Sequence, residues 1–386
     1  MYCVSLRIAA VASLCLVAAS CAGPNSHDLM RPEVAAVAPD KIAGSHDIFI
    51  ATTRAQAKNK AQVFDGQRSQ MPNFAKVTIS VPAIHKTGEI ERPKGKTARP
   101  DKFFTATELT AYSGDAAFEA ALRADIARHD HRALVFIHGY NNLFDDAVYR
   151  MTQLVHDSGF AGTPVLFSWA SGGRTVDYVY DRDSATAARD SLEETLRLLV
   201  KAGARRIDIV AHSMGNLVTM ETLRQLAIAG DRDLDGRLGD VILASPDIDV
   251  DVFKSQMRRY GKPERPFILL LSRDDRALTV SQIIAGDKPR LGDYANTEEI
   301  AELGLVVVDL SKVSAGDAAN HAKFANNPVM VKLLGESLKN GDLRRDPANA
   351  ENQIAALTKG LGNTLGATAS VVITLPGRIL DVTFGN

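Results

Sequence analysis

The stretch RIDIVAHSMG, residues 206–215, decides the fold of this chain. Its first half is a short apolar run of the kind that forms a strand buried on both faces of a parallel sheet. Its second half places Ser213 between the small residues Ala211 and Gly215, directly before an apolar helical pattern that begins at Asn216. A strand, a sharp turn and a helix in this order present a serine hydroxyl at the carboxyl end of a sheet, with a helix N-terminus behind it. We therefore expect Ser213 to be a nucleophile, although a pattern this short also recurs by chance.

Apolar runs and helical patterns alternate on both sides of this stretch. The expected strands cover residues 47–53, 75–81, 132–138, 164–169, 206–211, 241–244, 267–271 and 305–310. The expected helices cover residues 118–127, 145–158, 183–202 and 216–228. Strands that alternate with helices predict an α/β fold, with a mostly parallel central sheet and helices on both faces.

The run HGYNN, residues 138–142, follows one of these expected strands. When a serine attacks a carbonyl carbon, two N–H groups must already point at the oxyanion that forms. One normally belongs to the residue after the nucleophile, here Met214, and the other to a loop after an earlier strand. Tyr140 is our candidate for the second donor. Asn141 or Asn142 could supply it instead, and the run could also be no more than a tight turn.

A serine nucleophile needs a base that is oriented by a carboxylate, in the chain order serine, acid, histidine. The base should follow the last expected strand, and His321 is the only histidine after Ser213. The acid should follow the strand 267–271, where we prefer Asp275 to Asp274. Three weaker candidates follow an earlier strand, and we expect them to shape a loop beside the pocket: Asp247, Asp249 and Asp251.

The segments FIHGYNN, LFSWAS, AHSMGN, SRDDRAL and NHAKF occur here in the order seen in an uncharacterised bacterial group of esterase/lipase-like α/β-hydrolases. The chain resembles this group over about residues 46–330. The resemblance implies the α/β-hydrolase fold, ester hydrolysis in general, and triad roles for Ser213, Asp275 and His321. It favours Asp275 because the family pattern places its Asp two residues before an Ala-Leu pair, here Ala277-Leu278. No cofactor is implied, because such a triad needs none.

The N-terminus carries an export signal. Arg7 is followed by an apolar run, residues 8–19, that is too short to span a bilayer comfortably. Small residues then precede Cys21, which predicts a lipoprotein signal peptide over 1–20 and a lipidated Cys21. Such a lipid would anchor the protein to a membrane of the bacterial cell envelope, facing the periplasm. The alternative is an ordinary signal peptide cleaved after Ala22 or Gly23, which would give a secreted or periplasmic protein.

The rest of the chain divides by its patterning. Residues 21–45 lack hydrophobic periodicity and predict a tether. Residues 46–340 form the expected α/β-hydrolase domain. Residues 341–386 are expected to be a C-terminal extension, which packs on the domain or contacts the membrane.

The composition argues against several classes of function. The net charge of −1 and the lack of a dense Lys/Arg stripe argue against a nucleic-acid partner. All three cysteines lie within the first 21 residues, so the folded body has no disulfide framework and no cysteine nucleophile. His138 and His212 have no third ligand at metal spacing in the sequence, so we expect no metal site. The segment 231–236 imitates the start of a calcium loop, but Ile242 stands where the ligating Glu is needed.

These observations favour a serine carboxylesterase that acts on a small-molecule ester or lipid-like substrate. A thioesterase or amidase with the same triad is the alternative among hydrolases. A non-catalytic binding protein tethered to the envelope is the alternative from another class, and the placement of Ser213 and His321 argues against it. A membrane-active lipase would need an apolar lid, for which residues 85–105 are too polar.

Overall fold

The computed structural model describes residues 27–313, 318–340 and 369–384. The expected signal peptide and Cys21 lie outside these residues. Within the described ranges, none of the helices has the length and apolar character that crossing a membrane requires.

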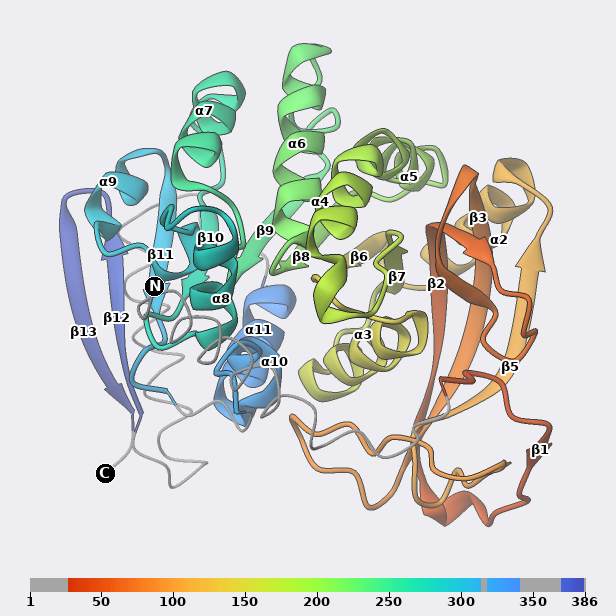
Figure 1. Ribbon diagram of the computed structural model, residues 1–386. Coiled ribbons are helices and arrows are strands. Elements are labelled where there is room, and N and C mark those ends of the chain that lie inside the picture. Colours follow the sequence, from red (N-terminus) through yellow and green to blue (C-terminus); the bar gives the residue numbers. More distant parts are fainter. Residues whose placement is uncertain (1–26, 314–317, 341–368, 385–386) are drawn as a thin grey trace, which may run out of the picture.

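One large sheet runs through the molecule (Figure 1). Its order among the described strands is β13-β12-β11-β10-β9-β8-β6-β7-β2-β3-β5, and pairing is parallel from β2 to β11 and antiparallel at both edges. The strand bounds are β2 Ile42–Gln56, β3 Phe64–Pro82, β5 Thr105–Tyr112, β6 Arg132–Ile137, β7 Thr163–Ser168, β8 Arg206–His212, β9 Leu238–Ala244, β10 Phe267–Leu271, β11 Leu305–Asp309, β12 Ala369–Leu375 and β13 Arg378–Phe384. A mostly parallel sheet confirms the expected α/β class.

Helices cover both faces of this sheet, because its central strands are apolar on both sides. One face is covered by α2 (Asp115–Ile126), α4 (Tyr178–Ala187), α5 (Arg189–Lys201), α6 (Gly215–Ile228), α7 (Val250–Tyr260) and α9 (Thr297–Glu302). The other face is covered by α3 (Phe144–Ser158), α10 (Lys323–Asn326) and α11 (Pro328–Asn340). A further helix, α8 (Arg276–Ile284), follows β10. The helix expected over 183–202 is divided at Ala188 into α4 and α5.

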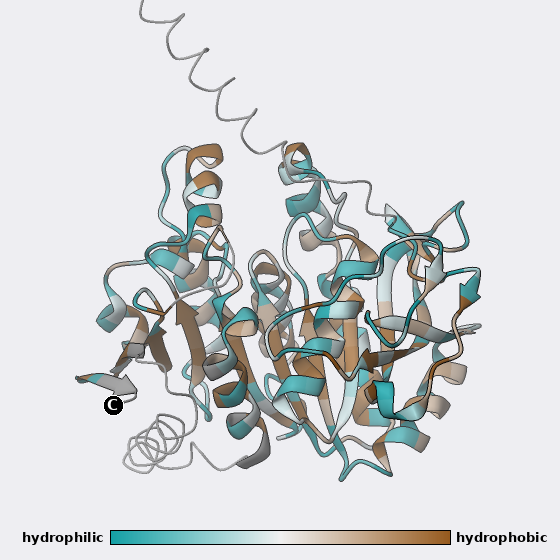
Figure 2. Ribbon diagram, turned by 90° about the horizontal axis from the view of Figure 1, so that it is seen from below, coloured by the Kyte–Doolittle hydropathy of each residue, from teal (hydrophilic) through white to brown (hydrophobic). Residues whose placement is uncertain are grey.

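Alternation along β6 shows how the sheet joins the two layers. Ala133, Val135 and Ile137 belong to one apolar cluster, while Leu134 and Phe136 belong to the other. All five side chains are at most 1% exposed. Figure 2 shows the central strands as mostly hydrophobic, with hydrophilic residues on the outer surfaces of the helices.

The strand order reverses beside β6, and this reversal creates a crevice. From β6 the chain passes through α3 to β7, and then returns through α5 to β8 on the other side of β6. The helices α3 and α6 therefore leave neighbouring strands toward opposite faces. In open α/β sheets, ligands bind at the carboxyl ends of the strands at such a point.

Both ends of the domain are larger than the sequence suggested. The tether expected over 21–45 is shorter, because Leu29 is buried, β1 (Glu33–Val34) pairs with β4 (Thr97–Ala98), and β2 begins at Ile42. The expected C-terminal extension contributes β12 and β13 to the sheet, where β12 pairs with β11. Packing of the C-terminal segment was one of the two expected alternatives, but strand pairing across long stretches of chain leaves no local pattern, so the strands themselves were not predicted.

Candidate active site

Ser213 lies on the sharp turn between β8 and α6. Its backbone has a φ of 53°, a left-handed conformation that a non-glycine residue adopts only under constraint, at a cost of about 1–3 kcal/mol. The Ser213 N–H donates to the carbonyl of Ala244 at 3.0 Å, and its carbonyl accepts from the N–H of Asp247 at 3.2 Å. The buried amide of Asn216 also donates to the Ser213 carbonyl, at 2.9 Å. These contacts hold the strained turn in place.

Two glycines allow this turn to lie close to the end of β6. A Cβ added at Gly139 would lie 2.7 Å from the Cβ of Ser213. A Cβ added at Gly215 would collide with the backbone carbonyls of Ile137 and His138. The loop after β6 and the turn that carries Ser213 are therefore in direct contact, as an oxyanion site requires.

His321 and Asp275 come from the loops after β11 and β10, and the structure brings them together. Nδ1 of His321 lies 2.7 Å from Oδ2 of Asp275, whose side chain is fully buried. The other oxygen, Oδ1, accepts from the N–H groups of Ala277 and Leu278 at the start of α8. The helix N-terminus therefore fixes the carboxylate that orients the imidazole.

Asp274 has a different set of partners. Its Oδ1 lies 2.6 Å from Nζ of the buried Lys323, and its Oδ2 accepts from the side chain of Asn320. Burial opposes its charge, but hydrogen bonds from Lys323 and Ser272 outweigh this effect and lower its pKa. Asp274 thus anchors the segment that carries His321 and makes no recorded contact with the imidazole.

The hydrogen bonds of the loop 138–142 show which of its backbone donors are already used. The N–H of Asn141 donates to Asp181, and the N–H of Asn142 donates to Oγ of Ser171. The side chain of Asn142 donates to the carbonyl of Tyr140. Within the described residues, no acceptor is recorded for the N–H groups of Tyr140 and Met214. The N–H groups of Tyr140 and Met214 are therefore available to an oxyanion, and Asn141 also lines the cavity.

Ser213 and His321 line the same cavity, of about 280 Å³. One wall is apolar and is formed by residues of α8: Ala277, Leu278, Val280 and Ile284. The opposite side carries Tyr140, Thr175 and Tyr178. A cavity of this size is at the small end of ligand pockets, so it suits a small group with an apolar part.

A buried polar network lies beside the cavity around Asp247, which we expected to shape a loop beside the pocket, while its partners Tyr178, Ser281 and Arg290 were not predicted. The carboxylate of Asp247 accepts from Tyr178 at 3.0 Å and from Ser281 at 2.5 Å, and it pairs with Arg290 at 3.3 Å. Burial raises the pKa of Tyr178 to about 12. Asp247 therefore shapes the pocket, and Asp249 caps α7 by accepting from the N–H groups of Asp251 and Val252.

Arg54 of β2 positions the loop after β6 and was also missed. Its guanidinium is fully buried and donates to the carbonyl of Asn142 at 2.7 Å, to Ser168 and to the carbonyl of Ser171. Burial lowers its pKa to about 10, so it remains charged at neutral pH. Asp181 acts on the same loop through Asn141. Each contact joins segments more than 35 residues apart, which is why no motif reveals it.

His138 and His212 support the site from below. His138 is fully buried and stacks on Trp169 with ring centroids 5.0 Å apart. Burial and the nearby Arg54 lower the pKa of His138 to about 3. Nε2 of His212 lies 3.1 Å from the carbonyl of His321, and burial keeps its pKa well below the usual value. Both are neutral packing groups at physiological pH.

Comparison with known proteins gives a family match and weak structural likenesses. The model of a family described as alpha/beta hydrolase of unknown function (DUF900) matches residues 114–337, more than half of the chain. An esterase of Pyrobaculum calidifontis aligns with 78% of this chain and 86% of its own, at 12% identity and a TM-score of 0.34.

An esterase of the fungus Rhizomucor miehei aligns with 72% of this chain and 81% of its own, at 10% identity and a TM-score of 0.35. An esterase of Pyrococcus furiosus aligns with 55% of this chain and 83% of its own, at 14% identity and a TM-score of 0.31. Likenesses this low carry no argument about activity. No curated protein matches the sequence.

Proposed function

Because the chain belongs to the α/β-hydrolase family whose model it matches, we propose that it is a serine hydrolase, and more narrowly a carboxylesterase. Ser213 is the nucleophile, His321 the base and Asp275 the acid that orients it. The observation that carries this proposal is that the strained Ser213 and the imidazole held by Asp275 line one cavity.

In the first step, Oγ of Ser213 attacks the ester carbonyl carbon while Nε2 of His321 accepts the hydroxyl proton. Asp275 keeps the proton of Nδ1 in place, so the imidazole has the correct tautomer and its charged form is stabilised. The N–H groups of Tyr140 and Met214 donate to the oxyanion. Each such donor typically contributes about 2.7–4 kcal/mol to lowering the barrier.

The tetrahedral intermediate then collapses. The bond from carbon to the alcohol oxygen breaks, and His321 donates its proton to the departing alcohol. A water molecule attacks the acyl-enzyme by the same path, with His321 again accepting a proton. The products are a carboxylic acid and an alcohol, and Ser213 regains its hydroxyl.

The cavity suggests the substrate class. Its volume and the apolar wall of α8 favour an uncharged ester with a small apolar acyl group. Asp247 is paired with Arg290, so the cavity has no unpaired carboxylate that would attract a cationic substrate. A thioester or amide fits the same triad and differs only in the leaving group.

Export and lipid anchoring at Cys21 belong to the same proposal and rest on the N-terminal sequence. A small-molecule ester hydrolase held at the envelope would meet its substrate outside the cytoplasm. Replacing Cys21 with Ser should move the protein from the membrane fraction to the soluble fraction. Unchanged membrane association would contradict the lipid anchor.

The catalytic proposal is tested with p-nitrophenyl esters of increasing acyl length. Wild type should hydrolyse the acetate and butyrate faster than the long-chain esters, and Ser213→Ala should reduce kcat by about 10⁶-fold. His129→Ala, beside Asp125 before the start of β6 and outside the cavity lining, is the matched control and should retain wild-type rates. Equal rates in wild type and Ser213→Ala would overturn the proposal.

A further inference from the structure

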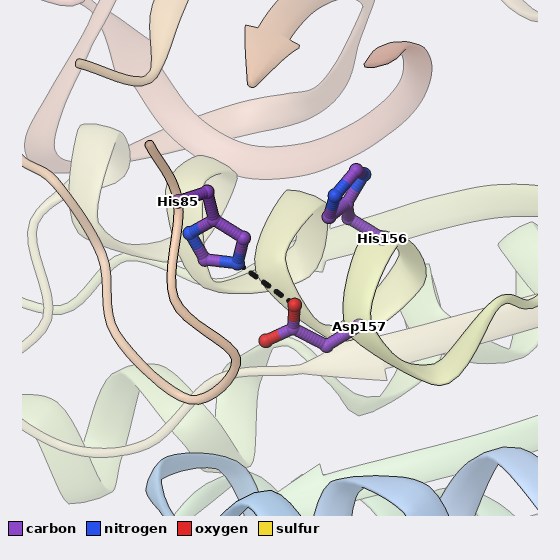
Figure 3. Close-up of side chains that lie close together, drawn as sticks. All are labelled: His85, His156 and Asp157. Carbon is purple, nitrogen blue, oxygen red and sulfur yellow. Dashed lines mark hydrogen bonds and ion pairs between the residues drawn. The ribbon is translucent and has the colours of Figure 1, made fainter. Parts of the chain in front are cut away.

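A second group of histidines and carboxylates lies apart from the cavity, at the last turn of α3. Figure 3 shows His156 and Asp157 side by side on this turn, with His85 facing them from the loop after β3. One nitrogen of each imidazole and one oxygen of Asp157 all lie within 4.8 Å of one another. The side chains of His85 and Asp157 are 4% and 1% exposed, while His156 is half-buried.

Each of these side chains has its other polar atom held by a neighbour. Nδ1 of His85 lies 2.7 Å from the carboxylate of Glu91. Nδ1 of His156 lies 3.0 Å from Nε2 of His46 on β2. Nε2 of His85 and Oδ1 of Asp157 already face each other at 2.8 Å, and we infer that Nε2 of His156 is the third ligand atom because its Nδ1 lies beside His46.

The remaining oxygen of Asp157 is held in the same way. Oδ2 accepts from the N–H of Gly88 at 2.8 Å and from the amide of Gln153 at 2.6 Å. Metal-binding imidazoles and carboxylates are oriented by outer partners of this kind, such as the carboxylate–histidine pair that Glu91 forms with His85. A cluster in which all three members are oriented this way resembles a built metal site.

The tautomers required for metal binding agree with these contacts. A neutral imidazole that donates its Nδ1 proton presents the lone pair of Nε2. His85 can donate from Nδ1 to Glu91, and His156 can donate from Nδ1 to His46. Nε2 of His85 lies 2.8 Å from Oδ1 of Asp157. The proton between these two atoms then occupies the position that a metal ion would take.

We propose that His85, His156 and Asp157 form a binding site for a divalent transition metal ion, with Zn²⁺ as the best fit. Two imidazoles and one carboxylate are a common zinc ligand set, and imidazole suits Zn²⁺ better than Mg²⁺ or Ca²⁺. When the ion binds, the proton between His85 and Asp157 leaves to solvent and water completes the coordination. This site is separate from the esterase proposal and does not depend on it.

The alternative is that a charged His85 only bridges Glu91 and Asp157. That bridge accounts for one imidazole of the cluster. It gives no role to His156, whose ring centroid lies 5.3 Å from the rings of both His85 and His46. The imidazoles of His46, His85 and His156 lie close together, so a second positive charge among them would be unfavourable. A bound metal ion would instead use the neutral imidazoles of His85 and His156 as ligands.

The site also touches the segment that carries His321. Gln153 donates to Asp157 and to the carbonyl of Ala325 in α10, four residues beyond His321. Gly88 packs against the backbone of Asn326, where a Cβ would collide. A metal ion would therefore fix the His85 loop, the end of α3 and α10 together, and a structural role for it follows.

The test uses the full chain, freed of metal with a chelator and titrated with Co²⁺ and then Zn²⁺. Co²⁺ should give visible absorption bands that saturate at one equivalent, and Zn²⁺ should displace it. Zn²⁺ should raise the thermal midpoint by about 3 °C or more. Ser213→Ala should bind both ions like wild type, since the two sites are independent.

Three variants decide the assignment. His156→Ala should abolish the Co²⁺ bands. Glu91→Gln, which keeps all three ligands, should weaken Zn²⁺ affinity by about 10–100-fold. His129→Ala removes a histidine outside the cluster, beside Asp125, and should bind like wild type. Failure of folded wild type to bind either ion, or equal binding by His156→Ala, would overturn the proposal.

Discussion

His321 and His85 have the same kind of partner at Nδ1 and different surroundings at Nε2. Each imidazole has Nδ1 at 2.7 Å from a carboxylate, Asp275 in one case and Glu91 in the other. The neighbours of Nε2 differ. His321 lines a cavity that also contains Ser213, whereas Nε2 of His85 lies 2.8 Å from the carboxylate of Asp157.

The surroundings of Nε2 therefore determine which chemistry each imidazole can perform. An imidazole that faces a hydroxyl and an open cavity can move a proton to and from a substrate. An imidazole that faces a second carboxylate and another imidazole can only hold a cation, whether a proton or a metal ion. We therefore propose that the same kind of histidine–carboxylate pair supports catalysis at one place and metal binding at the other.

The largest effect should come from replacing Asp275, the carboxylate of the proposed catalytic pair. Asp275→Asn keeps the cap of α8, since Asn accepts from Ala277 and Leu278 as well as Asp does. It no longer fixes the tautomer of His321, so kcat should fall by about 10⁴-fold with little change in KM. Steady-state kinetics on p-nitrophenyl butyrate measure this.

Asp183→Asn is the matched control for that variant, because Asp183 is exposed on α4. Its rates should equal those of wild type. A loss of less than ten-fold in Asp275→Asn would mean that His321 does not depend on this carboxylate.

A smaller effect should come from shifting the loop that carries Tyr140, with the imidazole of His321 left in place. In Gly139→Ala the new Cβ would lie 2.7 Å from the Cβ of Ser213, so the loop that carries Tyr140 must shift. Losing one oxyanion donor costs about 10²–10³-fold in kcat. Wild-type kcat in a folded Gly139→Ala would contradict the assigned oxyanion site.

The smallest effect concerns a third histidine that has neither role. Burial lowers the pKa of His138 to about 3, so it stays neutral in the folded protein and gains a proton on unfolding below about pH 6.5. The unfolded state then binds more protons, so the unfolding free energy falls as the pH decreases. The slope should be about 1.4 kcal/mol per pH unit for each such histidine between pH 6 and 5.

Denaturant unfolding at several pH values measures this slope, and NMR of the imidazole protons identifies the group. The His138 resonance, assigned by its loss in His138→Gln, should not titrate between pH 5 and 8. Burial likewise lowers the pKa of His46 to about 4, so it adds to the slope in the same direction. A His138 that titrates near pH 6.5 would show that its environment is open to solvent.

The sequence predicted the parts of the molecule that have local patterns. The strand, turn and helix around Ser213 are contiguous, and the order of strands along the chain indicated where to look for His321 and Asp275. All eight expected strands occur in the sheet. The choice between Asp275 and Asp274 rested on resemblance, and the distances to His321 and Lys323 now distinguish their surroundings.

The remaining parts depend on contacts between distant segments. Arg54 reaches the loop after β6 across 88 residues, and Asp247 meets Tyr178 across 69. His85 belongs to a stretch that reads as a polar surface loop, and it faces α3 only because β3 ends beside that helix. Charged residues look alike in a sequence whether they are solvated or enclosed, so such networks are visible only in the fold.

A fluorophosphonate probe tests most directly whether Ser213 is an activated nucleophile. Such probes phosphonylate a serine only where a neighbouring base removes its proton. The body of the protein, residues 22–386, would be treated as wild type, Ser213→Ala and His321→Ala, and its intact mass measured. Wild type should take up one equivalent of probe, mapped to Ser213, and neither Ser213→Ala nor His321→Ala should take up any. Folded wild type that takes up no probe, or Ser213→Ala that is labelled equally, would contradict the role assigned to Ser213.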